Sequence, residues 1–88
     1  MRFSYDPAKA VANRRKHGVS FADAEGVFGD PLALTVEDPD ASGERRYLAV
    51  GMGSAGDLLV VIYTGYGDEY RLISARRATR KERRQYEG

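Results

Sequence analysis

The sequence predicts one α+β domain: two helices, then four strands of an antiparallel sheet, then a short helix, with an additional short strand at the N-terminus. Three features predict this order. Apolar residues recur at helical spacing up to residue 28, apolar and polar residues alternate from residue 32 onward, and helix-capping residues precede each expected helix. Because helices and strands occupy separate stretches, the two N-terminal helices should lie on one face of the sheet. A chain of 88 residues has room for a single domain, 1–88, with one small core.

The first expected elements are a short strand at Arg2–Tyr5 and a helix at Pro7–His17. Asp6 can cap this helix, proline is favoured at its first position, and Gly18 can end it in a left-handed conformation. One face of the helix carries Ala8, Val11 and Ala12, and the opposite face carries Lys9, Asn13, Lys16 and His17.

A second helix is expected to begin after Ser20, which resembles a capping box together with Asp23, and to run to about Phe28. The Gly-Asp-Pro sequence at 29–31 ends it. The two helices should pack on the sheet through Val11, Phe21, Ala24, Val27 and Phe28.

Four segments then show the apolar pattern of strands: Leu32–Val36, Leu48–Met52, Leu58–Tyr63 and Tyr70–Ala75. The third is apolar on successive residues, as expected for a central strand covered on both faces. A loop at 38–43 and a turn at 65–68 connect neighbouring strands, which predicts an antiparallel meander. Thr79 and Glu82 form a second capping-box sequence and predict a short basic helix to about Tyr86.

The composition excludes several classes of protein. The chain has no cysteine, which excludes a disulfide framework, a thiolate zinc site and a cysteine nucleophile. The one long apolar run, Leu58–Tyr63, is far shorter than the roughly 20 residues of a membrane-spanning helix, and the N-terminus has no signal-peptide core. We therefore expect a soluble, cytoplasmic protein with no membrane partner.

Charge is distributed unevenly along the chain. Residues 71–88 contain seven Lys or Arg against two acidic residues, whereas residues 18–44 contain seven acidic residues and no Lys or Arg. A polarised surface is predicted, with a basic end suited to phosphate groups.

Gly51, Gly53 and Gly56 match the spacing of a dinucleotide-binding motif. That motif requires a helix immediately afterwards within an α/β unit, and here a strand follows. We interpret these glycines as a hairpin between two strands. No cofactor is expected.

Helix Pro7–His17 presents the only histidine of the chain. An imidazole can transfer a proton at neutral pH, but a histidine in the last turn of a helix also interacts favourably with the helix dipole. The face it shares with Lys9, Asn13 and Lys16 either is simply solvated or borders a groove for RNA, with Lys and Asn contacting phosphates.

The C-terminal basic cluster comprises Arg71, Arg76, Arg77, Arg80, Lys81, Arg83 and Arg84, with Tyr70 and Tyr86 interleaved. Guanidinium groups bind phosphate and aromatic rings stack on bases, so the cluster suits single-stranded RNA, although a solvated helix end would have the same composition. Arg71 and Arg76 would point to opposite sides of a regular strand, and a bulge would be needed to bring both to one cleft.

Three blocks of the sequence resemble the BrnT toxins of type II toxin–antitoxin systems. They are Tyr5-Asp6-Pro7-Ala8-Lys9 continuing to Arg15-Lys16-His17-Gly18-Val19-Ser20-Phe21, Val27-Phe28-Gly29-Asp30-Pro31-Leu32-Ala33, and Arg71-Leu72-Ile73-Ser74-Ala75-Arg76-Arg77-Ala78-Thr79 followed by Glu82, Arg83 and Tyr86. This resemblance implies a RelE-like fold and a ribonuclease that arrests translation and growth. It also implies a BrnA-like antitoxin with a ribbon-helix-helix DNA-binding segment, a 2:2 heterotetramer of toxin and antitoxin, and contact with operator DNA only through the antitoxin.

The RelE-like resemblance further implies cleavage without a metal ion, in which the ribose 2′-hydroxyl attacks the adjacent phosphate. On this basis Arg71 and Arg76 are assigned to stabilising charge in the transition state and His17 to proton transfer. Lys9, Lys16 and Arg80 are assigned to binding the RNA backbone. By similarity with the broader RelE-like group, Tyr86 is a further candidate for catalysis, as a base or as a stacking platform.

Two other functions remain open from the sequence. The chain could be a non-catalytic module that binds RNA or the antitoxin and acts in regulation of its own operon. It could also be a structural partner of a DNA-binding protein, with its basic helix on operator phosphates.

Overall fold

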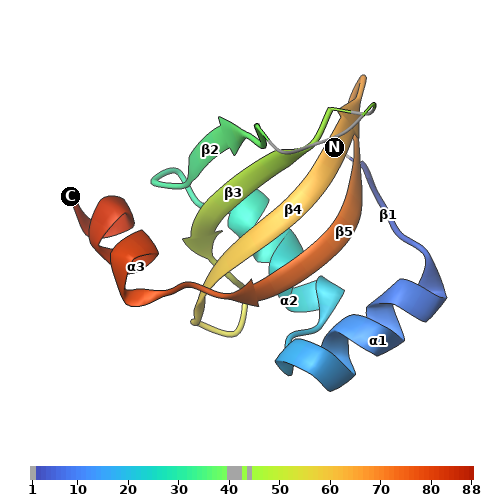
Figure 1. Cartoon of the computed structure of the whole chain (residues 1–88), viewed down its shortest axis with the longest axis horizontal. Coiled ribbons are helices and arrows are strands. Elements are labelled where there is room, and N and C mark those ends of the chain that lie inside the picture. Colours follow the sequence, from blue (N-terminus) through green and yellow to red (C-terminus); the bar gives the residue numbers. More distant parts are fainter. Residues whose placement is uncertain (1, 40–42, 44) are drawn as a thin grey trace.

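The computed structural model describes residues 2–39, 43 and 45–88. Its elements in chain order are β1 (Arg2–Ser4), α1 (Pro7–His17), α2 (Phe21–Glu25), the 3₁₀ helix η1 (Gly26–Gly29), β2 (Leu34–Glu37), β3 (Tyr47–Met52), β4 (Leu58–Tyr66), β5 (Glu69–Arg77) and α3 (Arg80–Glu87). The strands form one sheet in the order β1-β5-β4-β3-β2 (Figure 1).

The predicted α+β fold is confirmed. β2 to β5 form the antiparallel meander, and β1 pairs in parallel with β5 at the edge of the sheet. β4 and β5 are longer than predicted, because they continue to a tight turn in which Gly67 adopts a φ of 63°. The predicted loop at 38–43 includes residues 40–42, which lie outside the described residues.

The capping residues act as their positions predicted. Asp6 accepts a hydrogen bond from the Ala8 backbone at 2.9 Å, and Gly18 ends α1 with a φ of 70°. At α3, Thr79 and Glu82 form both hydrogen bonds of a capping box. In the described part of the chain, no helix is long and apolar enough to cross a membrane.

α2 and η1 lie across one face of the sheet (Figure 1) and form the core with it. Val19, Phe21, Ala24 and Val27 are buried there against side chains of β3, β4 and β5. Phe28 is only half-buried, but its ring centroid lies within 5.3 Å of those of Phe3, Tyr63 and Tyr70. We call the sheet face opposite α2 and η1 the open face.

The glycine motif serves close packing. A Cβ atom on Gly53 would lie 2.6 Å from a methyl carbon of Leu59. A Cβ atom on Gly26 in η1 would lie 2.5 Å from the backbone nitrogen of Ser54. Gly56 has a φ of 90° in the hairpin turn. These glycines therefore let the β3–β4 hairpin approach η1, and a strand follows the motif, as the sequence indicated.

The predicted orientation of α1 was wrong. Val11, expected in the core, is 53% exposed, whereas Asn13, expected on the outer face, is 6% exposed. α1 runs beside β5 at the edge of the sheet (Figure 1) and packs through Ala10 and Asn13. The reason is that α1 has no continuous apolar stripe, so a polar residue that can bond to backbone faces the sheet instead.

Asn13 joins α1 to the part of the β5 edge that lies beyond its pairing with β1. Its Nδ2 donates to the carbonyl oxygens of Val19 at 2.9 Å and Ala75 at 2.8 Å, and its Oδ1 accepts from the Ala75 backbone nitrogen at 3.0 Å. The side chain thus pairs with Ala75 much as a neighbouring strand would. This fixes the position of α1, and with it the residues that flank Asn13 on the helix.

Candidate functional site

A groove lies between α1 and β5, with a volume of about 270 Å³. Its lining residues are Lys9, Ala12, Asn13, Lys16, His17, Ile73 and Ser74. Three of the residues predicted to serve RNA, Lys9, Lys16 and His17, therefore lie together. The Asn13 side chain is bonded to protein atoms and is therefore not available to bind a phosphate in the way that one of the two interpretations of this helix face had it.

His17 occupies the last position of α1, beside Gly18. Its backbone carbonyl accepts a hydrogen bond from Arg77 at 3.3 Å, so that end of the helix is fixed to β5. Within the described residues, its half-buried imidazole has no hydrogen-bond partner. The backbone of His17 is therefore fixed beside the groove, and no hydrogen bond to the described residues occupies its ring nitrogens.

A β-bulge places Arg71 and Arg76 on the same face of the sheet. The register between β4 and β5 shifts after Ile62, because Ser74 pairs with Ile62 but Leu72 pairs with Tyr63. Leu72 and Ala75 consequently both point into the core. Arg71 precedes Leu72 and Arg76 follows Ala75.

Since side chains alternate on each side of the bulge, both arginines lie on the open face. Ser74, which pairs with Ile62, faces the same side and lines the groove. The sequence allowed for a bulge in this strand, and the consecutive apolar residues Leu72 and Ile73 are its local signal. Ser74 and Ile73 are site residues that the sequence had not indicated.

The two arginines differ in their partners. Nη1 and Nη2 of Arg76 donate to the two carboxylate oxygens of Glu82 at 2.8 and 2.9 Å. These hydrogen bonds lower the pKa of Glu82 to about 2 and raise the pKa of Arg76. The exposed Arg71 has no hydrogen bond or ion pair to any residue that the structure describes. Arg76 thus fastens α3 to β5, whereas the Arg71 guanidinium is available to a ligand.

Tyr86 is also engaged within the protein. Its hydroxyl donates to Asp30 Oδ2 at 2.5 Å, which raises the pKa of Tyr86 and lowers that of Asp30. Asp30 also accepts from the backbone nitrogens of Leu32 and Met52. The bond therefore attaches the last turn of α3 to the ends of η1 and β3, and Tyr86 is not among the residues that line the groove.

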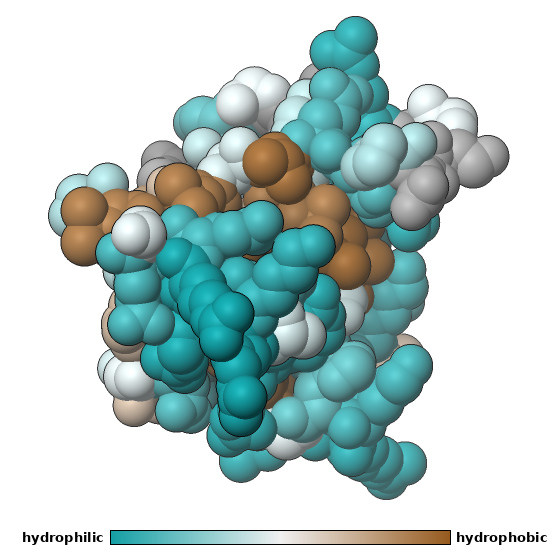
Figure 2. Space-filling model, turned by 60° about the vertical axis from the view of Figure 1, so that its left-hand side comes forward, coloured by the Kyte–Doolittle hydropathy of each residue, from teal (hydrophilic) through white to brown (hydrophobic). Residues whose placement is uncertain are grey.

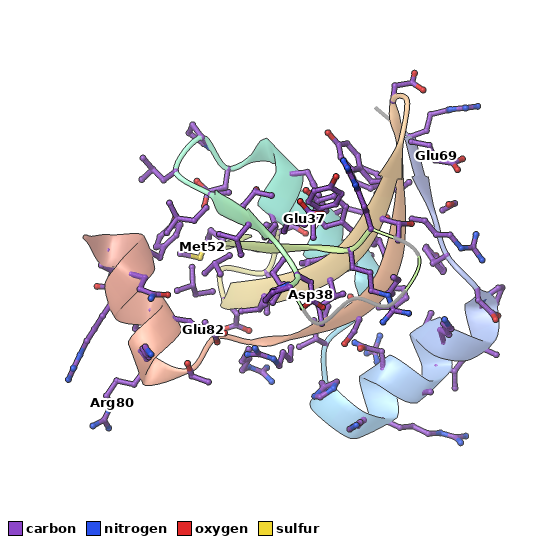
Figure 3. The ribbon with its side chains drawn as sticks, turned by 45° about the horizontal axis from the view of Figure 1, so that its top comes forward. Glu37, Asp38, Met52, Glu69, Arg80 and Glu82 are labelled. Carbon is purple, nitrogen blue, oxygen red and sulfur yellow. The ribbon has the colours of Figure 1, made fainter. Side chains whose placement is uncertain are left out.

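Arg80 lies at the first turn of α3 and points away from the sheet (Figure 3). In the same view Glu82 lies near the end of β5 and Met52 lies beside α3. Arg80 is exposed and is separated from the α1 groove by the β5–α3 connection. The structure thus groups Lys9, Lys16 and His17, places Arg71 on the same side, and leaves Arg80 apart.

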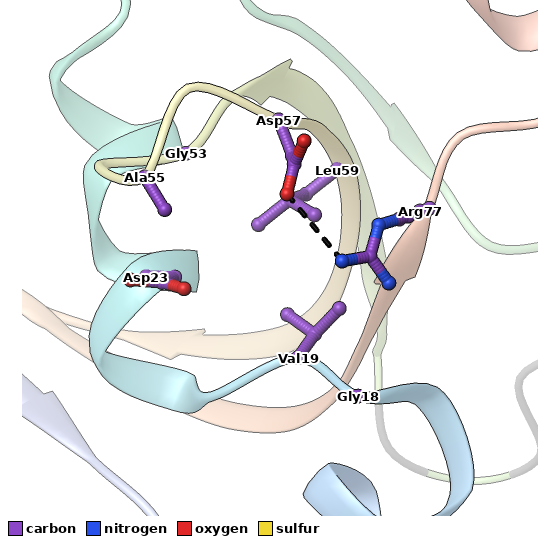
Figure 4. Close-up of a pocket in the computed structure, with 8 residues that line it drawn as sticks. All are labelled: Gly18, Val19, Asp23, Gly53, Ala55, Asp57, Leu59 and Arg77. Atoms are coloured by element: carbon purple, nitrogen blue, oxygen red, sulfur yellow. Dashed lines mark hydrogen bonds and ion pairs between the residues drawn. The ribbon is translucent and has the colours of Figure 1, made fainter.

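A second pocket, between the end of α1 and the β3–β4 hairpin, is too small for a nucleotide. Its volume is about 10 Å³, roughly the space of one water molecule. Arg77 closes it through an ion pair of 3.5 Å with Asp57 (Figure 4). Among the described residues, no three His, Cys, Asp or Glu side chains lie close enough together to hold a metal ion.

Comparison with known proteins identifies the family and supports the fold. Residues 5–82 match the family described as "Ribonuclease toxin, BrnT, of type II toxin-antitoxin system". The fold is similar to the crystal structure of the Brucella abortus ribonuclease toxin BrnT, with a TM-score of 0.66 and 26% sequence identity. The alignment covers 91% of this chain and 99% of that one. No curated protein sequence matches the chain. The match of the family over most of the chain, including the groove, β5 and the start of α3, shows that this protein belongs to the BrnT family of ribonuclease toxins of type II toxin–antitoxin systems.

Proposed function

We propose that this toxin cleaves single-stranded RNA without a metal ion, at the α1–β5 groove and the adjacent part of the open face. The observation that supports this most strongly is the β5 bulge, since it turns Arg71 to the side on which the His17 groove lies. A proton-transfer group, an unpaired guanidinium and two lysines then surround one surface.

The proposed reaction begins when the ribose 2′-oxygen attacks the adjacent phosphorus and loses its proton. The bond from phosphorus to the 5′-oxygen then breaks, and that oxygen takes up a proton. The products are a 2′,3′-cyclic phosphate and a 5′-hydroxyl end. His17 serves the proton transfer at one of these two oxygens, because an imidazole can act both as a proton donor and as a proton acceptor.

Arg71 neutralises the charge that develops on the phosphate oxygens. A guanidinium can bind two such oxygens at once, and its stabilisation is greatest when their negative charge increases in the transition state. Lys9 and Lys16 hold the flanking phosphates from the α1 side of the groove. Arg80, on the far side of β5, would contact a more distant part of the RNA.

Arg76 and Tyr86 take positioning roles in this proposal. The Arg76 guanidinium is occupied by Glu82, and the Tyr86 hydroxyl is bonded to a carboxylate that makes it harder to deprotonate. Both residues attach α3 to the sheet. We therefore expect Tyr86→Phe to weaken this attachment while retaining most of the cleavage rate.

The test is cleavage of a defined RNA by the purified toxin. His17→Gln should lower the rate by roughly 10²–10⁴-fold, and Arg71→Lys should also lower it, because the charge remains but the two-pronged geometry is lost. Arg14→Ala is the matched control: Arg14 is exposed on α1 but lines a different surface, beside Tyr5 and Val11.

The mechanism predicts further results with the same assay. Activity should persist in a chelator, and a 2′-deoxy nucleotide at the scissile position should prevent cutting. Loss of activity in chelator that magnesium restores would contradict the mechanism. Folded wild-type protein that binds RNA but never cuts it would instead favour a non-catalytic module that acts in regulation of its operon.

We also propose the assembly that the family resemblance implies: two toxins and two BrnA-like antitoxins in the cytoplasm, with operator DNA bound only through the antitoxin. Light scattering of the co-purified complex would give its mass. DNA binding by the toxin alone at physiological salt would contradict the last part.

A further inference from the structure

The open face is divided into an apolar part and a basic part. Two rows of paired residues cross it from β2 to β5: Leu34–Val50–Val60–Arg76 and Val36–Leu48–Ile62–Ser74. Each row begins with aliphatic side chains and ends with a polar one. The basic part, on β5, belongs to the proposed RNA surface, whereas the apolar part has no role in that proposal.

Six aliphatic or thioether side chains form what we call the apolar patch: Leu34, Val36, Leu48, Val50, Met52 and Ile62. Val36 is 61% exposed, Leu34 43% and Met52 38%, and the others are half-buried. On the side of the molecule where β2 and α3 lie, a hydrophobic band crosses the surface above a cluster of hydrophilic side chains (Figure 2). A contiguous apolar surface of this kind on a small protein marks an interaction site.

RNA does not account for the apolar patch. Proteins bind RNA through cations on phosphates, hydrogen bonds to base edges and stacking on aromatic or guanidinium planes, and the patch offers aliphatic groups only. Burial of aliphatic side chains is instead the main driving force of protein association. The patch is therefore suited to a protein.

The charges beside the patch define the chemistry of that protein. The acidic side chains next to it are already engaged: Asp30 with Tyr86 and Glu82 with Arg76. Asp38, which follows Val36 by two residues at the β2 side of the patch, is not free either. Arg71 lies on the same face without a partner among the described residues, and the exposed side of α3 carries further bases. A partner that covers the patch would thus meet a positive rim on its β5 and α3 sides.

A second copy of this chain fits poorly by the same reasoning. In a two-fold dimer the same surface meets itself, and the acidic side chains Asp30, Asp38 and Glu82 beside the patch already have partners, so the bases of the rim would gain few carboxylates. A partner with apolar side chains flanked by Asp and Glu would match both the patch and the rim.

We propose that the apolar patch and its basic rim bind an acidic, amphipathic segment of the cognate antitoxin. This inference rests on the proposed function, because the bound segment would place its carboxylates near Arg71 and so exclude RNA phosphates from the open face. Neutralisation would then be direct competition for one face of the sheet.

The experiment compares two exposed valines. Val36→Asp puts a charge on the most exposed side chain of the patch, whereas Val11→Asp makes the same change on α1, beside Tyr5 and Arg14 and away from the patch, where Val11 is 53% exposed. Binding of the full-length cognate antitoxin to each purified toxin is measured by titration, and thermal unfolding checks that both variants fold. Val36→Asp should weaken binding on the order of 100-fold, because an unpaired carboxylate would be buried in an apolar contact, and Val11→Asp should not.

Three results would overturn the proposal. The first is equal antitoxin binding by both variants. The second is unchanged antitoxin binding with a dimer in the wild type and a monomer in Val36→Asp by sedimentation, which would assign the patch to a second copy. The third is loss of RNA binding by Val36→Asp with antitoxin binding intact, which would assign it to RNA. Failure of the ribonuclease proposal is separate, since it would appear as absent cleavage in the wild type while the binding difference remained.

Discussion

Replacement of Asn13 tests whether one buried amide holds α1 in place. Asn13→Ala removes four hydrogen bonds, three of 2.8–3.0 Å and one of 3.4 Å from the Ser74 hydroxyl. Both backbone groups of Ala75 and the carbonyl of Val19 then lack that partner. Each unsatisfied buried group costs about 1–3 kcal/mol, but the adjacent groove would admit water to some of them. We therefore expect a loss of about 2–4 kcal/mol in the free energy of unfolding, which is roughly 10–25 °C in Tm for a domain of this size.

Asn13→Asp sharpens the test because the shape of the side chain is kept. One carboxylate oxygen could still accept from the Ala75 nitrogen, but the other would face the carbonyl oxygens of Ala75 and Val19. The difference in stability from the wild type should therefore be larger at pH 7 than at pH 4, where the introduced carboxyl group becomes protonated more readily.

Urea denaturation followed by circular dichroism measures these changes. Arg15→Ala is the control, because Arg15 is exposed on the same helix and its removal should change the free energy of unfolding by less than about 0.5 kcal/mol. If Asn13→Ala unfolded with the same free energy as this control, the amide could not be what holds α1 to β5.

Three further predictions follow from local geometry. Hydrogen bonds from Arg76 lower the pKa of Glu82 to about 2, so the ionised carboxylate stabilises the fold fully above about pH 4.5. This stabilisation is lost as the pH falls toward 2. Glu82→Gln should therefore show a smaller decrease in the free energy of unfolding over this pH range than the wild type, as measured by denaturation. Gly26→Ala should destabilise the fold by about 1–3 kcal/mol, because the new Cβ atom would lie against the backbone of Ser54. Gly29→Ala is the control, since the space around Gly29 is open, and it should leave the stability measured by calorimetry unchanged. Replacing Arg83 and Arg84 together with uncharged residues should reduce the salt dependence of RNA binding. The slope of log K against log salt concentration should fall by about 0.7 for each phosphate that is no longer bound. An unchanged slope would show that both arginines are solvated and do not contact RNA.

The fold was predictable because its signals are local. Capping residues, a left-handed glycine and alternation of apolar residues each act within a few positions, and the helices and strands appear at or near their expected places. The exceptions are small: β2 begins at Leu34 rather than Leu32, and the second helix continues beyond Glu25 as a 3₁₀ helix. Val11 was misplaced because an exposed valine and a buried asparagine reverse the usual preference. Only the free backbone edge of β5, 62 residues further on, explains why Asn13 is buried.

The candidate site was predictable in part for the same reason. Lys9, Lys16 and His17 share a helix face, so their proximity follows from helical spacing alone. The common face of Arg71 and Arg76 depends on the bulge, which the sequence permitted without requiring. Contacts that join distant segments, such as Tyr86 with Asp30, have no local signal.

The structure also divides the C-terminal basic cluster, which the sequence presented as one surface. Arg76 is paired with Glu82, and Arg77 with Asp57 and the His17 carbonyl. A cation already paired with a carboxylate releases few counterions when RNA binds, so these two arginines should add little to the salt dependence. Of the seven Lys and Arg residues between 71 and 88, five then remain to contact phosphates. The contribution of this segment to the logarithmic salt slope should thus not exceed about 3.5 for a single strand.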